Sequence, residues 1–215
     1  MNINGRTTLQ PRKTPIQARA AVTVEAITEA TIQVLLTVGL DRLTTNRVAE
    51  RAGVSVGTLY QYYPNKQSLL FALLEDALEK SAEALEMACE EARSKPLLEM
   101  VRHVVQRFVD AKMVRTDIST ALYQISADID GPALVKRMVQ RSEKALNAVI
   151  QTAPDIALPP ESFAVHMMYS AMAGAMRSAL EGRTSPAEVS KLKKHLVLLC
   201  QTYMLAETGR NRAGG

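Results

Sequence analysis

The stretch LTTNRVAERAGVSVGTLYQYYPNKQSLL, residues 43–70, predicts two short helices joined by a tight turn. A threonine pair precedes the first helix and Ser55 precedes the second, and both residue types cap helix N-termini. Gly53, between the helices, can adopt a positive φ at low cost, as a tight turn requires. Pro64 cannot donate a backbone hydrogen bond, so it ends the second helix.

The spacing of small and apolar residues in this stretch matches a helix-turn-helix. With Thr45 as position one, Ala49 is position five, Gly53 position nine and Leu59 position fifteen. Two helices that cross steeply need a small residue where they touch and an apolar residue to fill the core between them. The alternative interpretation is an αα-corner, which is a common connection in helical domains.

Three of the six tyrosines, Tyr60, Tyr62 and Tyr63, lie within four residues of one another. Ser55, Leu59 and Tyr63 follow i, i+4 spacing, so we expect them to share the inward face of the second helix. Tyr60 and Tyr62 then lie on its outer faces. There a tyrosine hydroxyl can reach a phosphate, and the ring can pack on a sugar or a methyl group. The second helix is therefore predicted to contact DNA.

Other residues of the second helix suit the same partner. Val56 can touch a thymine methyl, and Thr58 can hydrogen-bond a base edge or a phosphate. Gly57 lets the backbone approach a partner closely, and Gln61 also points outward. Lys66 begins the next helix, where its ammonium and the free backbone N–H groups can meet one phosphate together.

The basic excess of the chain is concentrated at its N-terminus. The sequence has 26 basic and 22 acidic side chains, a net charge of +4. Residues 1–66 hold eight of the basic and four of the acidic ones, and residues 1–21 contain no acid. This distribution indicates a polyanionic partner, although an ordinary solvated tail is the alternative. We expect Arg12, Lys13 and Arg19 to add phosphate or minor-groove contacts.

An all-α fold of about nine helices is predicted for the 215 residues. Helical spacing begins after Pro15 and resumes near residues 66, 96, 117, 132, 160 and 186, without a strand-like alternation. We expect a basic arm and DNA-binding domain over residues 1–66 and a larger helical body over residues 67–215. Cys89 and Cys200 lack metal-ligand spacing, so we expect buried, reduced thiols in a cytoplasmic protein without signal or membrane segments.

Residues 12–74 closely resemble the DNA-binding head of the TetR/AcrR family of bacterial transcription regulators, through RKTPIQARA and the stretch 43–70. The resemblance implies a homodimer with a variable helical ligand-binding body, and repression as the mode of action. It also implies DNA-contact roles at matching motif positions. With Thr44 and Gln61 added, the predicted DNA-binding residues are Thr45, Asn46, Arg47, Ser55, Val56, Gly57, Thr58, Tyr60, Tyr62 and Lys66.

The helical body is expected to enclose an apolar cavity for a small-molecule effector. Candidate lining residues combine an apolar side chain with a polar tip, or are methionines, which adapt to irregular ligands. They are Met100, His103, Phe108, Met113, Tyr123, Met138, His166, Met167, Tyr169 and Met172. The alternative is that each is an ordinary core residue.

The last two expected helices, over residues 160–181 and 186–206, are candidates for a dimer interface. Small residues recur on the first of them and leucines on the second, which allows close packing against another helix. The candidates are Ala171, Gly174, Ala175, Ser178, Leu192, Leu196, Leu199 and Tyr203. The alternative is that these stripes pack within the chain.

These observations favour a sequence-specific DNA-binding regulator, specifically a repressor released from a palindromic operator by a hydrophobic effector. The alternative is a DNA-binding regulator controlled by a protein partner, or a constitutive one, without a small-molecule effector. An enzyme would need a titratable cluster, for which only His103 and His166 offer a start, and no HExxH, GxSxG or Walker motif occurs. We therefore expect no catalytic residue, no metal site and no cofactor.

Overall fold

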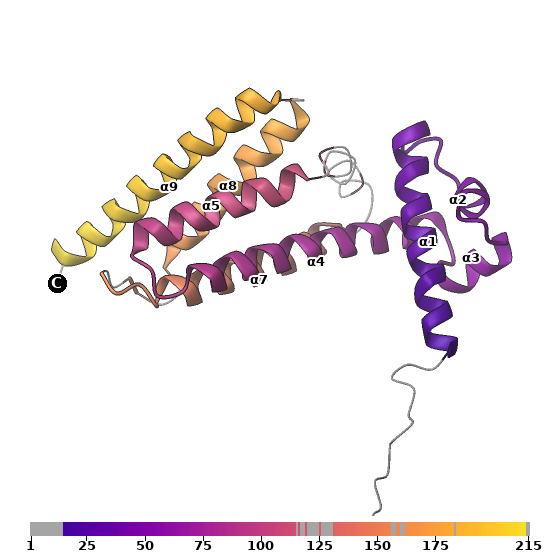
Figure 1. Cartoon of the computed structure of the whole chain (residues 1–215), viewed down its shortest axis with the longest axis horizontal. Coiled ribbons are helices and arrows are strands. Elements are labelled where there is room, and N and C mark those ends of the chain that lie inside the picture. Colours follow the sequence, from indigo (N-terminus) through magenta and orange to yellow (C-terminus); the bar gives the residue numbers. More distant parts are fainter. Residues whose placement is uncertain are drawn as a thin grey trace, which may run out of the picture. The chain divides into compact units, whose positions relative to one another are not determined.

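A computed structural model describes residues 15–114, 116, 119, 125, 131–155, 158–159, 162–182 and 184–213. This part of the chain is all-α (Figure 1), which confirms the predicted fold class. Its eight helices are α1 (Pro15–Val38), α2 (Thr45–Ala52), α3 (Val56–Tyr62), α4 (Lys66–Ala92), α5 (Leu97–Met113), α7 (Gly131–Ile150), α8 (Phe163–Glu181) and α9 (Pro186–Ala213). The chain divides into two compact units, the head, Met1–Leu69, and the body, Leu70–Gly215.

α2 and α3 begin at the predicted caps, and a glycine follows each of α1 and α2. Gly39 follows α1 with φ +79°, and Gly53 follows α2 with φ +67°, both in the left-handed region that glycine tolerates. The side chains of Thr44 and Ser55 each accept a hydrogen bond from the backbone N–H three residues later, at 3.4 and 2.9 Å. These bonds satisfy N–H groups that the first turn of a helix leaves unpaired.

The three helices of the head share one small core. α1 packs on α2, and α2 packs on α3. Ile27 from α1, Val48 from α2 and Leu59 from α3 are all fully buried, and Ala49 is 1% exposed. Among the described helices, only α1, over Arg19–Val38, has the length and apolar composition of a membrane-crossing segment. A single such helix is weak evidence of a membrane span, since a core helix of a soluble protein also passes this test of length and composition.

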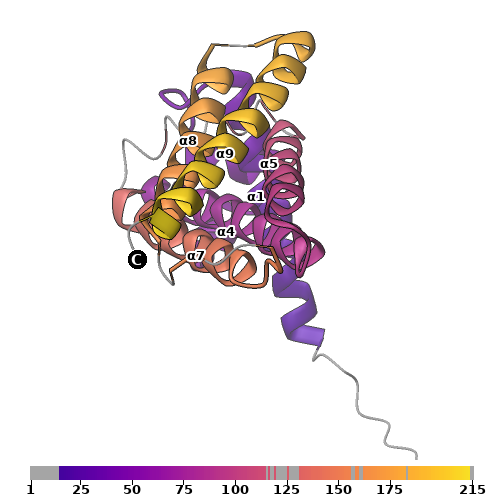
Figure 2. The ribbon, with the colours of Figure 1, turned by 90° about the vertical axis from the view of Figure 1, so that its left-hand side faces the viewer.

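The body is a bundle with a continuous hydrophobic core. α9 packs on α5 and α8, and α8 also packs on α7 (Figure 2). Residues from α4, α5, α7, α8 and α9 meet in this core, among them Leu85, Leu97, Phe108, Leu146, Met168, Met172, Met176, Cys200 and Met204. Cys89 and Cys200 are both free and buried, and burial raises the pKa of the Cys89 thiol to about 12.

Several body helices begin at capping interactions that the sequence contains. At the start of α4, the Ser68 N–H donates to Asn65 Oδ1 at 2.7 Å. At the start of α9, the Ser185 N–H donates to a Glu188 carboxylate oxygen at 2.8 Å and the Glu188 N–H donates to the Ser185 hydroxyl at 3.4 Å, which together form a capping box. The predicted helix starts near residues 117 and 160 fall outside the described residues.

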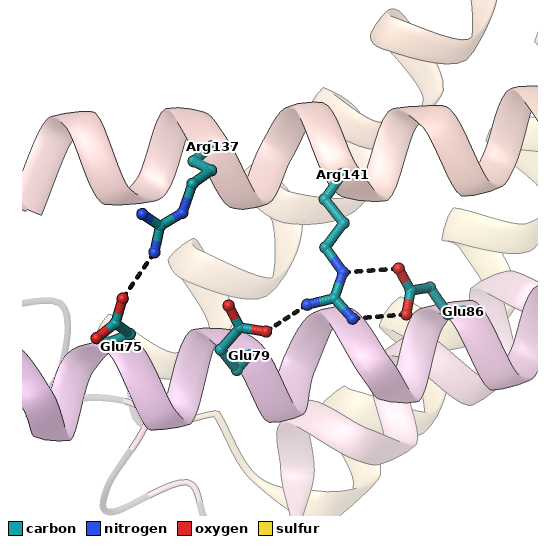
Figure 3. Close-up of polar contacts among 5 residues, drawn as sticks. All are labelled: Glu75, Glu79, Glu86, Arg137 and Arg141. Atoms are coloured by element: carbon teal, nitrogen blue, oxygen red, sulfur yellow. Dashed lines mark hydrogen bonds and ion pairs between the residues drawn. The ribbon is translucent and has the colours of Figure 1, made fainter.

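Two arginines of α7 join it to three glutamates of α4 (Figure 3). Arg141 donates to both carboxylate oxygens of Glu86, each at 2.7 Å, and forms a further ion pair with Glu79. Arg137 pairs with Glu75 at 2.7 Å. The hydrogen bond from Arg141 lowers the pKa of the Glu86 carboxyl below its ordinary value. We call these five residues the α4–α7 ion ladder.

Candidate nucleic-acid interface

The outer face of α3 exposes the residues that were predicted to contact DNA. Val56 is 37% exposed, Tyr60 47% and Tyr62 36%, so three large apolar or aromatic side chains are exposed together on one short helix. Gly57 and Gln61 are exposed as well. Leu59 points the other way and is fully buried. The helix therefore packs on the head through Leu59 and exposes most of its other residues, whereas Thr58 is half-buried.

Ser55 does not lie on the inward face, where i, i+4 spacing with Leu59 places it. It is exposed, and its hydroxyl caps α3 and lies 2.8 Å from the Thr58 hydroxyl. Ser55 precedes the first helical residue, so its backbone is extended and the helical spacing rule does not extend to it. Tyr63, just past the other end, is half-buried.

Tyr60 connects the two helices of the motif. Its hydroxyl lies 3.2 Å from the Thr45 hydroxyl at the start of α2. Thr45 is half-buried, whereas Thr44, Asn46 and Arg47 beside it are exposed. The Arg47 guanidinium donates to the Arg42 carbonyl at 2.8 Å, and this bond holds the guanidinium at the turn between α1 and α2. The predicted contacts of α2 and α3 thus adjoin one another through Tyr60 and Thr45.

Lys66 does not present a free ammonium to the partner. Its Nζ donates to the Leu40 carbonyl at 2.7 Å, in a partly buried position. This bond ties the start of α4 to the turn after α1, so in the free protein Lys66 stabilises the head. Sequence spacing gave no indication of Leu40, which lies 26 residues earlier in the chain.

A groove of about 480 Å³ lies between α1 and α2, lined by Gln33, Val34, Thr37, Val38, Arg47, Glu50 and Arg51. Arg51 donates to the Gln33 side chain across it at 2.6 Å. None of the residues predicted to bind an effector lines this groove.

The predicted effector residues of the body separate into two groups. Met100, Phe108 and Met172 lie in the body core, Met113 and Tyr169 pack against it, and Met138 is also buried. Tyr123 lies outside the described residues.

The second group does not face the core. His103 pairs with Glu91 at 2.8 Å, His166 pairs with Glu143 at 2.6 Å, and Met167 is 43% exposed. Each imidazole therefore pairs with a carboxylate of another helix, His103 of α5 with Glu91 of α4 and His166 of α8 with Glu143 of α7. Their role in an effector site was predicted from composition, which does not specify the face of a helix that its neighbours cover, and it stays a prediction.

The predicted dimer stripe on α9 is also divided by the structure. Leu196 is 3% exposed and lies in the core, and Leu192 and Tyr203 pack against that core. Leu199 is 55% exposed, and it is joined by Leu198 at 60%. The i, i+4 spacing of leucines that predicted a dimer interface therefore identified mainly the inward face of α9, because that face is the more regularly apolar one.

On α8 the small residues divide in the same way. Ala175 packs against the core and Ala171 is half-buried, whereas Gly174 and Ser178 are exposed. Phe163, at the start of α8, is 71% exposed, and Leu205 of α9 is 43% exposed. The sequence reading missed Phe163, Leu198 and Leu205. The sequence could have identified them as apolar residues that lie outside the core-facing stripe of an amphipathic helix.

Two sequence families match the chain, one in each unit. Residues 20–73 match the family described as bacterial regulatory proteins, tetR family. Residues 96–204, half of the chain, match the tetracyclin repressor-like C-terminal domain. The first match contains the whole described helix-turn-helix, and the second runs from α5 into α9.

Individual relatives agree with these matches. Tetracycline repressor protein class C from Escherichia coli is 44% identical over 54 residues. The matched residues make up 25% of this chain and cover only 25% of that relative's length. A TetR-family regulator structure from Mesorhizobium loti superposes with a TM-score of 0.71 at 15% identity, over 87% of this chain and 98% of that one. LfrR from Mycobacterium smegmatis, solved with proflavine, gives 0.55 at 24% identity, over 83% and 96%. The helix-turn-helix, the fold of the body and both family matches lead to one conclusion: the chain belongs to the TetR family of bacterial regulatory proteins.

Proposed function

We propose that the protein is a cytoplasmic transcriptional repressor that binds a palindromic operator as a homodimer and is released by a small hydrophobic effector. The observation that carries the proposal is the outer face of α3. Val56, Tyr60 and Tyr62 are exposed there although they are apolar or aromatic, and Gly57 leaves the backbone accessible beside them. Such a surface suits the edge of the major groove, where methyl, sugar and phosphate groups alternate.

A dimer is needed because one α3 can read only a few base pairs. Two copies related by a two-fold axis would place their α3 helices in successive major grooves, about 34–36 Å apart. The operator would then share the symmetry of the protein and read as a palindrome.

The exposed apolar residues of α8 and α9 support a dimer through the body. Phe163 and Met167 on α8, and Leu198, Leu199 and Leu205 on α9, are between 43% and 71% exposed. The two helices pack on each other, so these residues belong to adjoining elements. A second copy with the same face would cover them, and exposed Gly174 would let the helices come close.

Release by an effector would follow from a shift between two dimer states. An effector that binds the body only when the heads are misaligned favours that state by its differential affinity, and a few kcal/mol is sufficient. Of the residues predicted to bind an effector, Met100, Phe108 and Met172 lie in the body core and Met113 and Tyr169 pack against it, so these five lie close enough to belong to one site.

The test is the selection of bound duplexes from a random library, using the full chain. We expect a palindromic consensus. Tyr62→Ala should weaken binding to that duplex by about tenfold through the loss of a phosphate or sugar contact. The matched control is Met87→Ala, at an exposed residue of α4 in the body, which should bind normally. No enrichment from a folded, dimeric protein would show that α3 is not a sequence reader.

A further inference from the structure

The C-terminal end of α5 holds a lysine in an unusual environment. Lys112 is partly buried, and its ammonium lies 5.9 Å from the centre of the Phe108 ring. Among the described residues its ammonium has neither a hydrogen bond nor an ion pair, whereas its backbone carbonyl accepts a hydrogen bond from the Ser119 hydroxyl at 3.4 Å. Desolvation lowers the pKa of the Lys112 ammonium, so its surroundings disfavour the charge rather than compensate it.

The carboxylates of the described helices around Lys112 are engaged elsewhere. The described parts of α5, α7 and α8 contain four of them. Asp110 pairs with Lys193, Glu143 with His166 and Glu181 with Arg177. Glu99 lies at the opposite end of α5, about 20 Å away along the helix axis. On α9, which also packs on α5, Glu188 accepts hydrogen bonds from Ser185 at the start of the helix, and Glu207 lies near its other end. None of the described carboxylates of these four helices therefore forms an ion pair with Lys112.

The other neighbours of Lys112 form a mixed apolar and polar surface across three helices. The Phe108 ring meets the Tyr169 ring edge-on, with centroids 6.2 Å apart. The Tyr169 hydroxyl shares a hydrogen bond with Ser142 of α7, which is 3% exposed. Met113 packs against the same core. A partly buried, desolvated ammonium without an anionic partner beside aromatic rings is costly for a fold but well suited to an anionic ligand with an apolar body.

We propose that Lys112 is the anion-binding residue of the effector site, and that the effector is an apolar organic acid whose carboxylate pairs with the Lys112 ammonium. Its apolar part would lie along Phe108 and Met113, and the Tyr169 hydroxyl offers a second polar contact. The proposal rests on the proposed function, because it specifies the chemistry of the effector that the repressor would sense. It narrows the chemical class of the proposed effector from hydrophobic compounds in general to hydrophobic anions.

The experiment compares matched probes on the full chain without DNA. Two series share one apolar group each and differ only in the head: decanoate, decanamide and decylamine, and 2-naphthoate, 2-naphthamide and 2-naphthylmethylamine. Binding is measured by titration calorimetry, below the micelle concentrations of the decyl probes. We expect the acid of at least one series to bind about tenfold or more tightly than its amide and amine.

Variants identify the residue responsible. Lys112→Met keeps the length of the side chain and should abolish the preference for the acid, whereas Lys112→Arg should retain it. Lys136→Met, at an exposed lysine of α7, is the matched control and should bind like the unmodified chain. Equal binding of acid and amide in both series, the absence of acid binding in both, or acid binding that survives Lys112→Met would each overturn the proposal.

Stability provides a second measurement. Without ligand, Lys112→Met should melt no lower than the unmodified chain, because it removes a charge that has no partner. A clear drop in melting temperature would show that Lys112 is paired within the chain, and would also overturn the proposal. Operator binding is measured separately. If the protein binds no duplex, the proposed function is wrong, even where acids bind the body. If acids and amides release DNA equally, only the proposal of an anionic effector is wrong.

Discussion

Two positions of the helix-turn-helix are occupied by glycine for different physical reasons. Gly53 has φ +67°, so its backbone conformation itself favours glycine. Gly57 lies within α3, and a Cβ added there would meet only the Ser55 hydroxyl, at 3.7 Å. Nothing within the head requires a glycine at position 57. The proposed function supplies the requirement, because the DNA backbone would approach α3 at this position.

The two positions predict opposite effects of alanine. Gly57→Ala should leave the stability of the head unchanged or slightly raised, because alanine is the better helix former, yet lower operator affinity by about tenfold or more. Gly53→Ala is the reciprocal control and should destabilise the head by about 1–2 kcal/mol through its left-handed backbone. Urea unfolding and DNA titration on both variants check this. Normal operator affinity in a folded Gly57→Ala protein would mean that α3 does not closely approach DNA.

Lys66 shows how a single contact changes the role of a residue. A lysine at the first position of α4 fits a phosphate contact by sequence position alone. The Leu40 carbonyl instead holds its ammonium at 2.7 Å, where it joins α4 to the turn after α1. An interaction over 26 residues depends on how the three helices pack, and a local pattern contains no information on that.

At the scale of the element, the two arginines of the α4–α7 ion ladder differ in the number of glutamates they contact. Arg141 contacts two glutamates, Glu79 and Glu86, whereas Arg137 contacts only Glu75. The planar guanidinium of Arg141 binds Glu86 through two parallel hydrogen bonds, a geometry stronger than a single contact. We therefore expect Arg141 to contribute most of the ladder's stabilisation.

Replacing the two arginines by methionine tests this expectation. Arg141→Met should lower the urea midpoint more than the matched variant Arg137→Met does, and the difference should shrink in high salt because exposed ion pairs are screened. The folded pKa of Glu86 lies below its ordinary value of 4.5. Its ionised form therefore stabilises the fold above that pH, and the stabilisation is lost as the pH falls below 4.5 through the lowered pKa. Equal effects of the two variants at pH 7, or a difference that persists in acid, would contradict this role.

α9 illustrates the limit of periodicity within one element. Its leucines occupy two faces, one with Leu192 and Leu196 toward the core and one with Leu198 and Leu199 toward solvent. Both faces are apolar, so the sequence does not say which of them meets α5 and α8. The inward face is settled only when all three helices pack together.

At the scale of the whole molecule, the exposed face of α8 and α9 predicts the oligomeric state. Leu198→Lys should convert the dimer to a monomer, because a buried lysine without a partner opposes association. Operator affinity should fall by more than about tenfold, since a single head loses the second half-site. The matched control is Met87→Lys, since Met87 and Leu198 are both 60% exposed. Sedimentation and DNA titration give the readouts, and a Leu198→Lys protein that remains dimeric would place the interface elsewhere.

The sequence by itself determined the helical fold and the ends of most helices. Gly39, Gly53, Ser55 and Pro186 act through their own backbone or through neighbours within a few residues, so their effects are local. It also indicated the exposed face of α3, because a helix of seven residues can bury only one face. These features need no knowledge of distant contacts.

Only the tertiary structure decided which apolar and charged residues remain available to a partner. It buried Leu196 and exposed Leu198, paired His103 and His166 with glutamates at the surface, and left the Lys112 ammonium without an anionic partner among the described residues. The reason is physical: burial and pairing depend on which helix faces meet across the bundle. A helix has several faces, and only the neighbours it packs against select which of them becomes core and which becomes a site.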